Sequence, residues 1–292
     1  MLHVEGQFTG QDGLALYYQR WLPDRASKAA LGLVHGLGSH SGWFASLAHA
    51  LVNHGYSVHG YDLRWHGRSA GQRGYINHWQ EFRQDLAAFH QLIQTENPAQ
   101  PIFTLGHSLG GVILIDYALH YPEALSGLIT MAPAIGPVGI SPVRLAIGQI
   151  LSKIWPRFSL NSGISRNSGS HDAEIVNAYN NDPLRHSKGT ARLVTEYLKT
   201  THSIHSHIQD LKQPILILHG SSDEVALPES GRHFFESLSS VDKEYREYAG
   251  GYHDLHNDDC SAALTCDLVN WLNRQVHHKS LFCRINRQLT LV

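Results

Sequence analysis

The chain has 292 residues, 42% of them hydrophobic, which is enough to bury one large α/β domain or two smaller ones. Its 23 basic and 25 acidic side chains give a formal net charge of −2 without long blocks of one sign, which argues against binding to nucleic acid. Because the sequence shows neither an amino-terminal basic and apolar leader nor a run of 18 apolar residues, we expect a cytoplasmic protein.

The first twenty residues predict an antiparallel hairpin at the edge of a sheet, with its turn near residues 11–13. Beyond it, short β-forming runs alternate with helical patterns, which is typical of a parallel sheet covered on both faces. The predicted strands are residues 30–35, 57–61, 102–105, 128–132, 215–219 and 244–248.

Two segments show helical periodicity. Apolar residues recur at three- and four-residue steps at Trp79, Phe82, Leu86, Phe89 and Ile93, which predicts a helix with one buried face. A last helix is expected over roughly residues 261–276, and the tail from 279 to 292 receives no assignment.

The strand predicted at residues 102–105 runs into the pattern GxSxG at residues 106–110, and an apolar helical run follows. A strained turn between a strand and a helix lifts a serine hydroxyl above the sheet, where a base can take its proton. Ser108 is therefore the candidate nucleophile. The alternative is a glycine-rich turn that caps a core helix.

Some seventy residues, 134–207, separate two predicted strands that are elsewhere joined by 20 to 30, so we expect an inserted helical cap. Residues 161–171, rich in Ser, Gly and Asn, predict a mobile loop. A helix over residues 141–155 has an apolar face, formed by Val143, Ile147, Ile150, Leu151 and Ile154. This face is either buried on the core, or exposed to admit a lipid substrate or touch a membrane surface transiently. On the second interpretation Ile147 and Leu151 bind the substrate.

A serine nucleophile needs an imidazole base, and the imidazole needs a carboxylate that fixes its tautomer. Asp223 follows the strand predicted at residues 215–219, and ligand chemistry in open α/β sheets occurs at that edge. His253 follows the next strand and a glycine pair. Asp223 is the candidate acid, with Glu224 as its competitor, and His253 is the candidate base, with His256 as its competitor. His107 is expected to pack beside the serine.

The negative charge that develops on an attacked carbonyl oxygen must meet preplaced N–H donors. The backbone N–H of Leu109, directly after the serine, is one candidate. The backbone N–H of Leu37, in the glycine-rich loop after the first predicted parallel strand, is the other. Because both contribute backbone atoms, their side chains are free to shape the pocket.

Cysteine and histidine do not predict a metal centre. The three cysteines fit neither a zinc site nor a disulfide framework and are expected to be free thiols: Cys260, Cys266 and Cys283. Two histidine clusters lack the partners of a zinc site and are expected at the surface: His202, His205 and His207, and His277 and His278. With 22 histidines, the chain should become distinctly cationic as the pH falls through about 6.5. No cofactor is expected.

Four motifs occur in a recognisable order: His-Gly-Leu-Gly-Ser-His-Ser-Gly at 35–42, Gly-His-Ser-Leu-Gly-Gly at 106–111, the Asp223 loop, and Gly-Gly-Tyr-His-Asp-Leu-His at 250–256. In these motifs the chain resembles the α/β-hydrolase superfamily, and within it the monoacylglycerol lipase and lysophospholipase branch. The resemblance implies a mostly parallel eight-stranded sheet flanked by helices. Together with the inserted segment, this predicts residues 1–133 and 208–292 as the core and 134–207 as the cap.

One motif departs from the family pattern. Residues 62–69 resemble its D-x-x-G-x-G-x-S loop, but Trp65 stands where glycine is usual. If that position requires a positive φ, the tryptophan is strained or the turn differs.

The resemblance implies a serine hydrolase that cleaves esters of single-chain lipids, of the monoacylglycerol or lysophospholipid type, through an acyl-enzyme. A short-chain esterase, a thioesterase and a peptidase share the same core, so they stay open as alternatives, as does a non-catalytic ligand-binding homologue. The acyl length, the alcohol group and the oligomeric state do not follow from the sequence.

Overall fold

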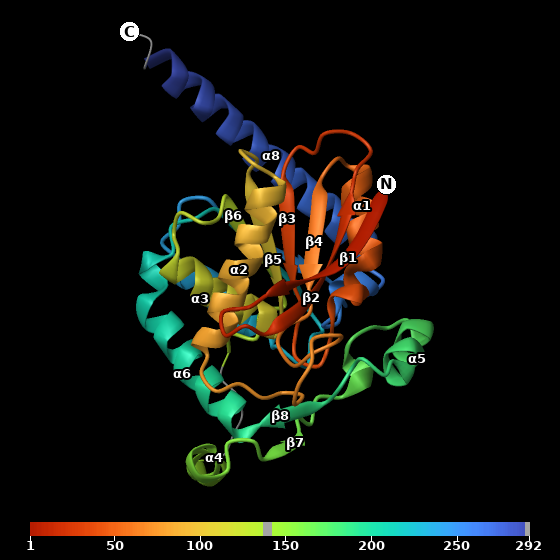
Figure 1. Ribbon diagram of the computed structural model, residues 1–292, viewed down its shortest axis with the longest axis vertical. Helices are drawn as coiled ribbons and strands as arrows, with labels where there is room; N and C mark the ends of the chain where they lie inside the picture. The colour runs from red at the N-terminus through yellow and green to blue at the C-terminus, as the bar shows by residue number, and fades with distance from the viewer. Residues whose placement is uncertain (137–141, 290–292) are drawn as a thin grey trace.

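The computed structural model describes residues 1–136 and 142–289, without the side chains of residues 142–145, 166 and 279–289. An eight-stranded sheet has the order β1-β2-β4-β3-β5-β6-β9-β10. The β1–β2 and β2–β4 pairs are antiparallel and the other pairs are parallel (Figure 1). The strands are β1 Leu2–Thr9, β2 Ala15–Leu22, β3 Ala30–Val34, β4 Ser57–Tyr61, β5 Ile102–His107, β6 Gly127–Met131, β9 Ile215–Gly220 and β10 Lys243–Tyr248.

Helices cover both faces of the sheet because both faces of its central strands are apolar. In β3, Leu31 and Leu33 pack with α1 and α8, whereas Ala30 and Val34 face the opposite core with α2, α3 and α7. The helices of the two layers are α1 Ala45–Asn53, α2 Gln80–Glu96, α3 Leu109–His120, α7 Pro228–Ser237 and α8 Ser261–Leu289. The predicted fold class is confirmed.

The predicted core elements agree with the structure to within about two residues. Hairpin β1–β2 turns at Gly13, whose φ is 80° and whose N–H donates to the Gly10 carbonyl. All five apolar residues of the predicted α2 stripe are buried. The last helix was predicted too short, since α8 continues to Leu289, and no glycine or proline after Val276 stops it.

The chain between β6 and β9 folds into a further set of elements: α4 Pro142–Ile154, β7 Ser159–Asn161, α5 Ala173–Asn181, β8 Lys188–Thr190 and α6 Ala191–His207. We refer to residues 134–207 as the insertion. Most of it lies beyond the carboxyl ends of the parallel strands, at the bottom of Figure 1. In the segment 161–171, where a mobile loop is expected, Asn161 is the last residue of β7, which pairs with β8, and residues 166–168 form one 3₁₀ turn.

Helix α4 does not bury its apolar face on the core. Ile147 and Ile150 are more than half exposed, Ile154 is 75% exposed and Trp155 is 59% exposed. The helix is held instead through α6, with the Ser152 hydroxyl 2.8 Å from that of Thr195. Ser141 lies outside the described residues, as does the side chain of Val143. Among the helices that the structure describes, none is both long and apolar enough to cross a membrane.

Candidate functional site

Ser108 occupies a strained turn between β5 and α3. Its φ of 54° and ψ of −118° lie in a region that non-glycine residues rarely adopt. The turn is held because the Ser108 N–H donates to the Met131 carbonyl over 3.0 Å. A Cβ at Gly106 would lie 2.4 Å from the Gly110 carbonyl oxygen, and one at Gly110 would lie 2.2 Å from that of Val34. The flanking glycines are therefore required by close packing of backbone, as the motif predicts.

Asp223 and His253, the candidate acid and base, are joined by a hydrogen bond. The His253 Nδ1–H donates to Asp223 Oδ2 over 2.7 Å, and Asp223 Oδ1 accepts from the backbone N–H groups of Val225 and Ala226 at 2.8 and 2.9 Å. Both side chains are almost fully buried. This geometry leaves His253 Nε2 as the ring nitrogen available to a reacting group.

The electrostatics of the pair match a base oriented by a carboxylate. Burial disfavours the charged imidazole of His253, but the Asp223 carboxylate outweighs burial and raises the pKa of His253 above its usual 6.5. Burial also opposes ionisation of Asp223, yet His253 and the hydrogen bonds to the carboxylate hold its pKa below the usual value. Asp223 is thus an anion wherever His253 can act as a base.

Three of the predicted site residues line one cavity of about 60 Å³. Ser108, His253 and Leu37 line it, with further lining residues from the insertion. Ligand pockets usually measure roughly 300–1,000 Å³, so this one is small. Of the predicted substrate-binding residues, neither Ile147 nor Leu151 is among the residues that line it.

The loop that carries Leu37 lies directly against the serine turn. A Cβ at Gly36 would lie 2.9 Å from Ser108 Cβ. His35, which sequence reasoning left without a role, fixes this loop, since its Nδ1–H donates to the Gly36 carbonyl and its Nε2 accepts the Leu63 N–H. The backbone of Leu37 is thereby held beside Ser108, and Leu109 begins α3 on its other side.

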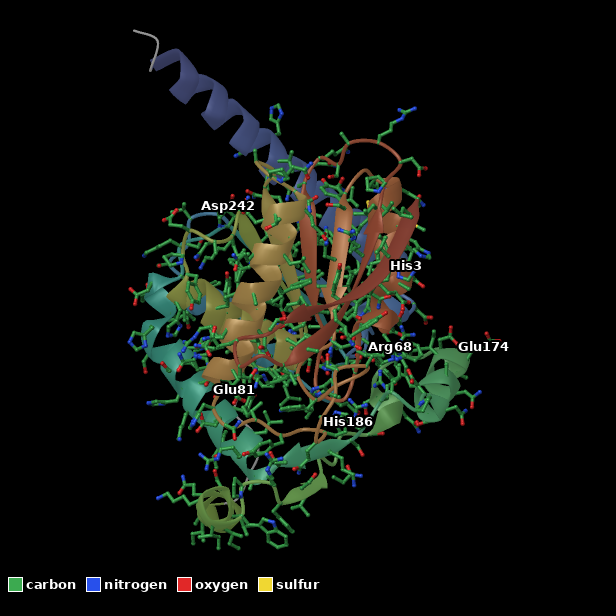
Figure 2. All side chains as sticks on the ribbon, in the orientation of Figure 1. His3, Arg68, Glu81, Glu174, His186 and Asp242 are labelled. Carbon is green, nitrogen blue, oxygen red and sulfur yellow. The ribbon has the colours of Figure 1, made fainter. Side chains whose placement is uncertain are left out.

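The insertion reaches this loop through His186, which Figure 2 labels where the insertion meets the loops of the core. The His186 N–H donates to the Gly38 carbonyl over 3.0 Å, and its ring lies 4.6 Å from that of His66. Two more backbone bonds join the insertion to the His253 loop. The Asp254 N–H donates to the Gly169 carbonyl over 2.8 Å, and the His253 N–H donates to that of Ser168 over 3.4 Å.

Glu224 and His256, the alternative candidates for the acid and the base, take no part in the Asp223–His253 pair. Glu224 is exposed, whereas Asp223 points into the protein. His256 stacks on Phe44 with ring centroids 4.3 Å apart. His107 packs beside the serine turn as expected, with Nε2 3.2 Å from the His253 carbonyl and 3.3 Å from Asp254 Oδ1.

The sequence did not predict how many histidines are buried. The two clusters that were expected at the surface are exposed. Six other histidines are buried and uncharged. Burial lowers the pKa to about 3 for His59, His90 and His256, to about 4 for His66 and His107, and well below the usual 6.5 for His35. While the chain is folded, these buried histidines therefore do not add to the rise in positive charge that is expected as the pH falls through about 6.5.

Trp65 does adopt the positive φ that its position in the motif suggested, with a value of 66°. Gly71 accommodates it, because a Cβ at Gly71 would lie 1.6 Å from Trp65 Cε3. A glycine six residues later thus leaves room for the indole ring, while the backbone of Trp65 keeps its strained positive φ.

Two groups of side chains have the spacing of a metal site within the residues that the structure describes: His107, His253 and Asp254, and His171, Asp258 and Asp259. In the first, hydrogen bonds already engage His107 and His253. In the second, the His171 Nδ1–H donates to Asp258, whose other oxygen accepts the Tyr252 N–H over 2.8 Å. These contacts explain both groups without a metal ion.

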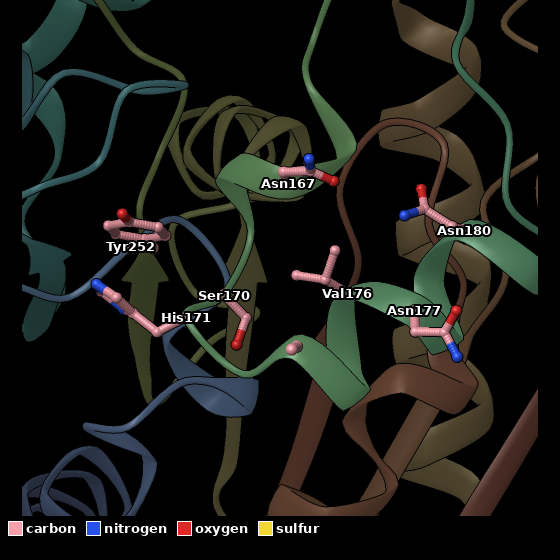
Figure 3. Close-up of a pocket in the computed structure, with 8 residues that line it drawn as sticks. Asn167, Ser170, His171, Val176, Asn177, Asn180 and Tyr252 are labelled. Carbon is pink, nitrogen blue, oxygen red and sulfur yellow. The ribbon is translucent and has the colours of Figure 1, made fainter.

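A second, wider cavity of about 500 Å³ lies on the surface beside this last group and does not include Ser108 (Figure 3). The His171 and Tyr252 rings lie 3.6 Å apart at one side of it, and the rest of its lining comes mainly from α5 and the turn at Asn167. Its lining is mixed, with polar and apolar side chains, and the cavity is open to solvent.

Residues 25–260 match the serine aminopeptidase S33 family. The chain belongs to this family of α/β-hydrolases. It is 29% identical to a monoacylglycerol lipase of Mycolicibacterium smegmatis over 92% of this chain and 96% of that one. It is 31% identical to the monoglyceride lipase of Rattus norvegicus over 92% of this chain and 88% of the relative.

A solved structure supports the same placement. The monoacylglycerol lipase of Paleococcus ferrophilus superposes with a TM-score of 0.81 at 29% identity, over 90% of this chain and 99% of that one. This S33 family member is therefore a hydrolase that resembles monoacylglycerol lipases, as its motifs implied.

Proposed function

We propose that the protein is a serine carboxylester hydrolase that cleaves single-chain acyl esters of the monoacylglycerol or lysophospholipid type. The observation that carries the proposal is the Asp223–His253 hydrogen bond beside a cavity that Ser108 also lines. The relatives named monoacylglycerol lipase support the substrate class. The core is assigned to residues 1–133 and 208–292, and the insertion is its cap.

In this mechanism Ser108 attacks the ester carbonyl while His253 Nε2 takes its proton, and Asp223 holds the imidazole in the tautomer that allows this. The amides of Leu37 and Leu109 stabilise the oxyanion. His253 then protonates the leaving alcohol, and water hydrolyses the acyl-enzyme by the same steps in reverse order.

A fluorophosphonate probe tests the nucleophile directly. We expect one covalent label per chain, and peptide mapping should place it on Ser108. The Ser108→Ala variant should stay unlabelled while the neighbouring His107→Asn variant still reacts. A label on another residue contradicts the assignment.

The pH profile tests the base. Because Asp223 raises the pKa of His253, the acid limb of kcat/KM should have its midpoint above about 6.5. Asp223→Asn removes the carboxylate and leaves the burial, so the remaining activity should show an acid limb at lower pH. Glu224→Gln, which changes an exposed neighbour, serves as the control. An acid limb that Asp223→Asn leaves in place would exclude the pair as the titrating unit.

The size of the cavity supports a second candidate, a short-chain esterase, because a long acyl chain does not fit into about 60 Å³ without movement of the insertion. The two candidates differ in their response to chain length. Each added CH₂ that becomes buried contributes up to about 0.8 kcal/mol to the binding free energy of the substrate. The kcat/KM of a lipid hydrolase should therefore rise as the acyl chain grows.

We expect medium or long p-nitrophenyl esters to exceed acetate by at least tenfold in kcat/KM, measured from two to sixteen carbons below the micelle limit. If the exposed face of α4 contacts the acyl chain, Ile147→Ser should narrow the difference. A maximum at acetate that Ile147→Ser does not change rejects the lipid substrate and favours the short-chain esterase.

A further inference from the structure

Arg185 brings a positive charge near enough to the cavity of Ser108 to act on the His253 imidazole. It belongs to the segment of the insertion between α5 and β8, and it lines the same cavity as Ser108 and His253. The three share a space of about 60 Å³, so a substrate bound at Ser108 lies within reach of Arg185.

Two aromatic rings hold the guanidinium in place. Its Cζ lies 3.9 Å from the centroid of the Tyr179 ring and 5.7 Å from that of Trp43. Both rings are anchored, since the Tyr179 hydroxyl accepts from Asn257 Nδ2 and the Trp43 indole donates to Asp182. Stacking covers the faces of a guanidinium and leaves the N–H groups at its edge free to donate.

The nearby carboxylates each contact another side chain, although Asp254 still interacts electrostatically with Arg185. Asp223 accepts from His253, and Asp254 lies 3.3 Å from His107. Asp182 accepts from His40 and Trp43. Arg185 forms no ion pair with any carboxylate in the described part of the chain, although many other arginines do. A half-buried cation that no carboxylate contacts directly is suited to pair with an anion that arrives with the substrate.

We propose that Arg185 determines specificity by binding an anionic group of the substrate, a phosphate or a carboxylate within a few bonds of the ester. This inference rests on the proposed ester hydrolase and narrows its substrate class to anionic monoesters. A planar guanidinium matches the paired oxygens of either group, which a lysine does less well. A neutral ester gains nothing from Arg185 beyond contact.

Matched ester pairs test the proposal and separate the two sources of the anion. Monobutyrylglycerol is compared with its phosphate ester, which places the charge on the alcohol. Methyl butyrate is compared with monomethyl succinate, in which a carboxylate replaces the terminal methyl group of the acyl chain. The full chain is assayed at low salt, because screening weakens exposed charges.

We expect the wild type to prefer one of the anionic esters over its neutral partner by roughly 10- to 100-fold in kcat/KM, the range for a hydrogen-bonded charge. Arg185→Gln should abolish that preference mainly through KM and leave the neutral ester within about threefold. Arg185→Lys should restore part of it. Lys188→Gln removes an exposed cation of the insertion and should have no effect.

The outcomes distinguish this proposal from the proposed function. Equal hydrolysis of both members of each pair by the wild type, or a preference that survives Arg185→Gln, overturns the role of Arg185 and leaves the ester hydrolase in place. If no ester is cleaved, the anion site can still be tested by asking whether an anion protects Ser108 against the fluorophosphonate probe. Inorganic phosphate should slow labelling of the wild type but not of Arg185→Gln, and equal labelling rates would reject the anion site.

Discussion

Replacing Ser108 by alanine should lower kcat by about 10⁴-fold or more, because the variant lacks the hydroxyl that attacks the ester carbonyl in the proposed mechanism. Asp223→Asn should lower kcat severely as well, by up to about 10⁴-fold, since an amide can hold the imidazole in the wrong tautomer. Both variants keep the size of the side chain close to the original, so circular dichroism and the melting temperature should show an intact fold.

The proposed triad should act as a unit, and this provides the control. Once Ser108 is alanine, the base has no proton to take, so adding His253→Ala should cost little further activity. Glu224→Gln, the single-variant control for Asp223→Asn, should keep full activity. Retention of more than about a tenth of the wild-type kcat by Ser108→Ala would show that Ser108 is not the nucleophile.

A second large effect is expected on stability: the protein should unfold on mild acidification. His59, His66, His90, His107 and His256 have folded pKa values of about 3 to 4, below the unfolded value of about 6.5. Between these values the unfolded chain binds more protons, so the free energy of unfolding falls as the pH decreases.

At pH 5 each of these histidines costs about 2 kcal/mol relative to pH 7. Five of them together reach on the order of 10 kcal/mol, which is comparable to the whole stability of a typical domain. His253 has the opposite sign, since its raised pKa contributes stability at low pH that is lost as the pH rises through that value. The five outweigh it.

Denaturant unfolding at pH 7, 6 and 5 measures this directly. His90→Gln removes one buried titrating ring and keeps a polar atom near Thr104, with which His90 Nε2 makes a 2.8 Å hydrogen bond. This variant should reduce the loss of unfolding free energy between pH 7 and pH 5 by about 2 kcal/mol. His202→Gln, at an exposed position, should not change how the free energy of unfolding depends on pH. A free energy of unfolding that is constant down to pH 5 would contradict buried neutral histidines.

The fold and the Asp223–His253 pair could be predicted because they depend on local patterns. Buried parallel strands are continuous apolar runs, and the residues at their carboxyl ends meet at one edge of the sheet. The Gly106 and Gly110 positions are fixed by backbone contacts that allow no side chain, so the motif carries structural information.

What could not be predicted depends on contacts between distant segments. Arg185 carries no motif, and only the folded insertion brings it to the cavity of Ser108. His59 and His90 are ordinary histidines in the sequence, and only tertiary packing excludes water from them. The length of α8 was missed for a simpler reason, since no residue after Val276 marks an end.

The backbone bonds between the insertion and the His253 loop link entry of substrate to readiness for reaction. The Asp254 N–H is held by Gly169 and that of His253 by Ser168, so an outward movement of that part of the insertion takes these acceptors away from the segment that carries the base. If a bulky substrate enters by such a movement, we expect the imidazole to be less constrained while it enters. For bulky esters the rate of reclosure would then limit kcat, and no change at Ser108 would raise that limit.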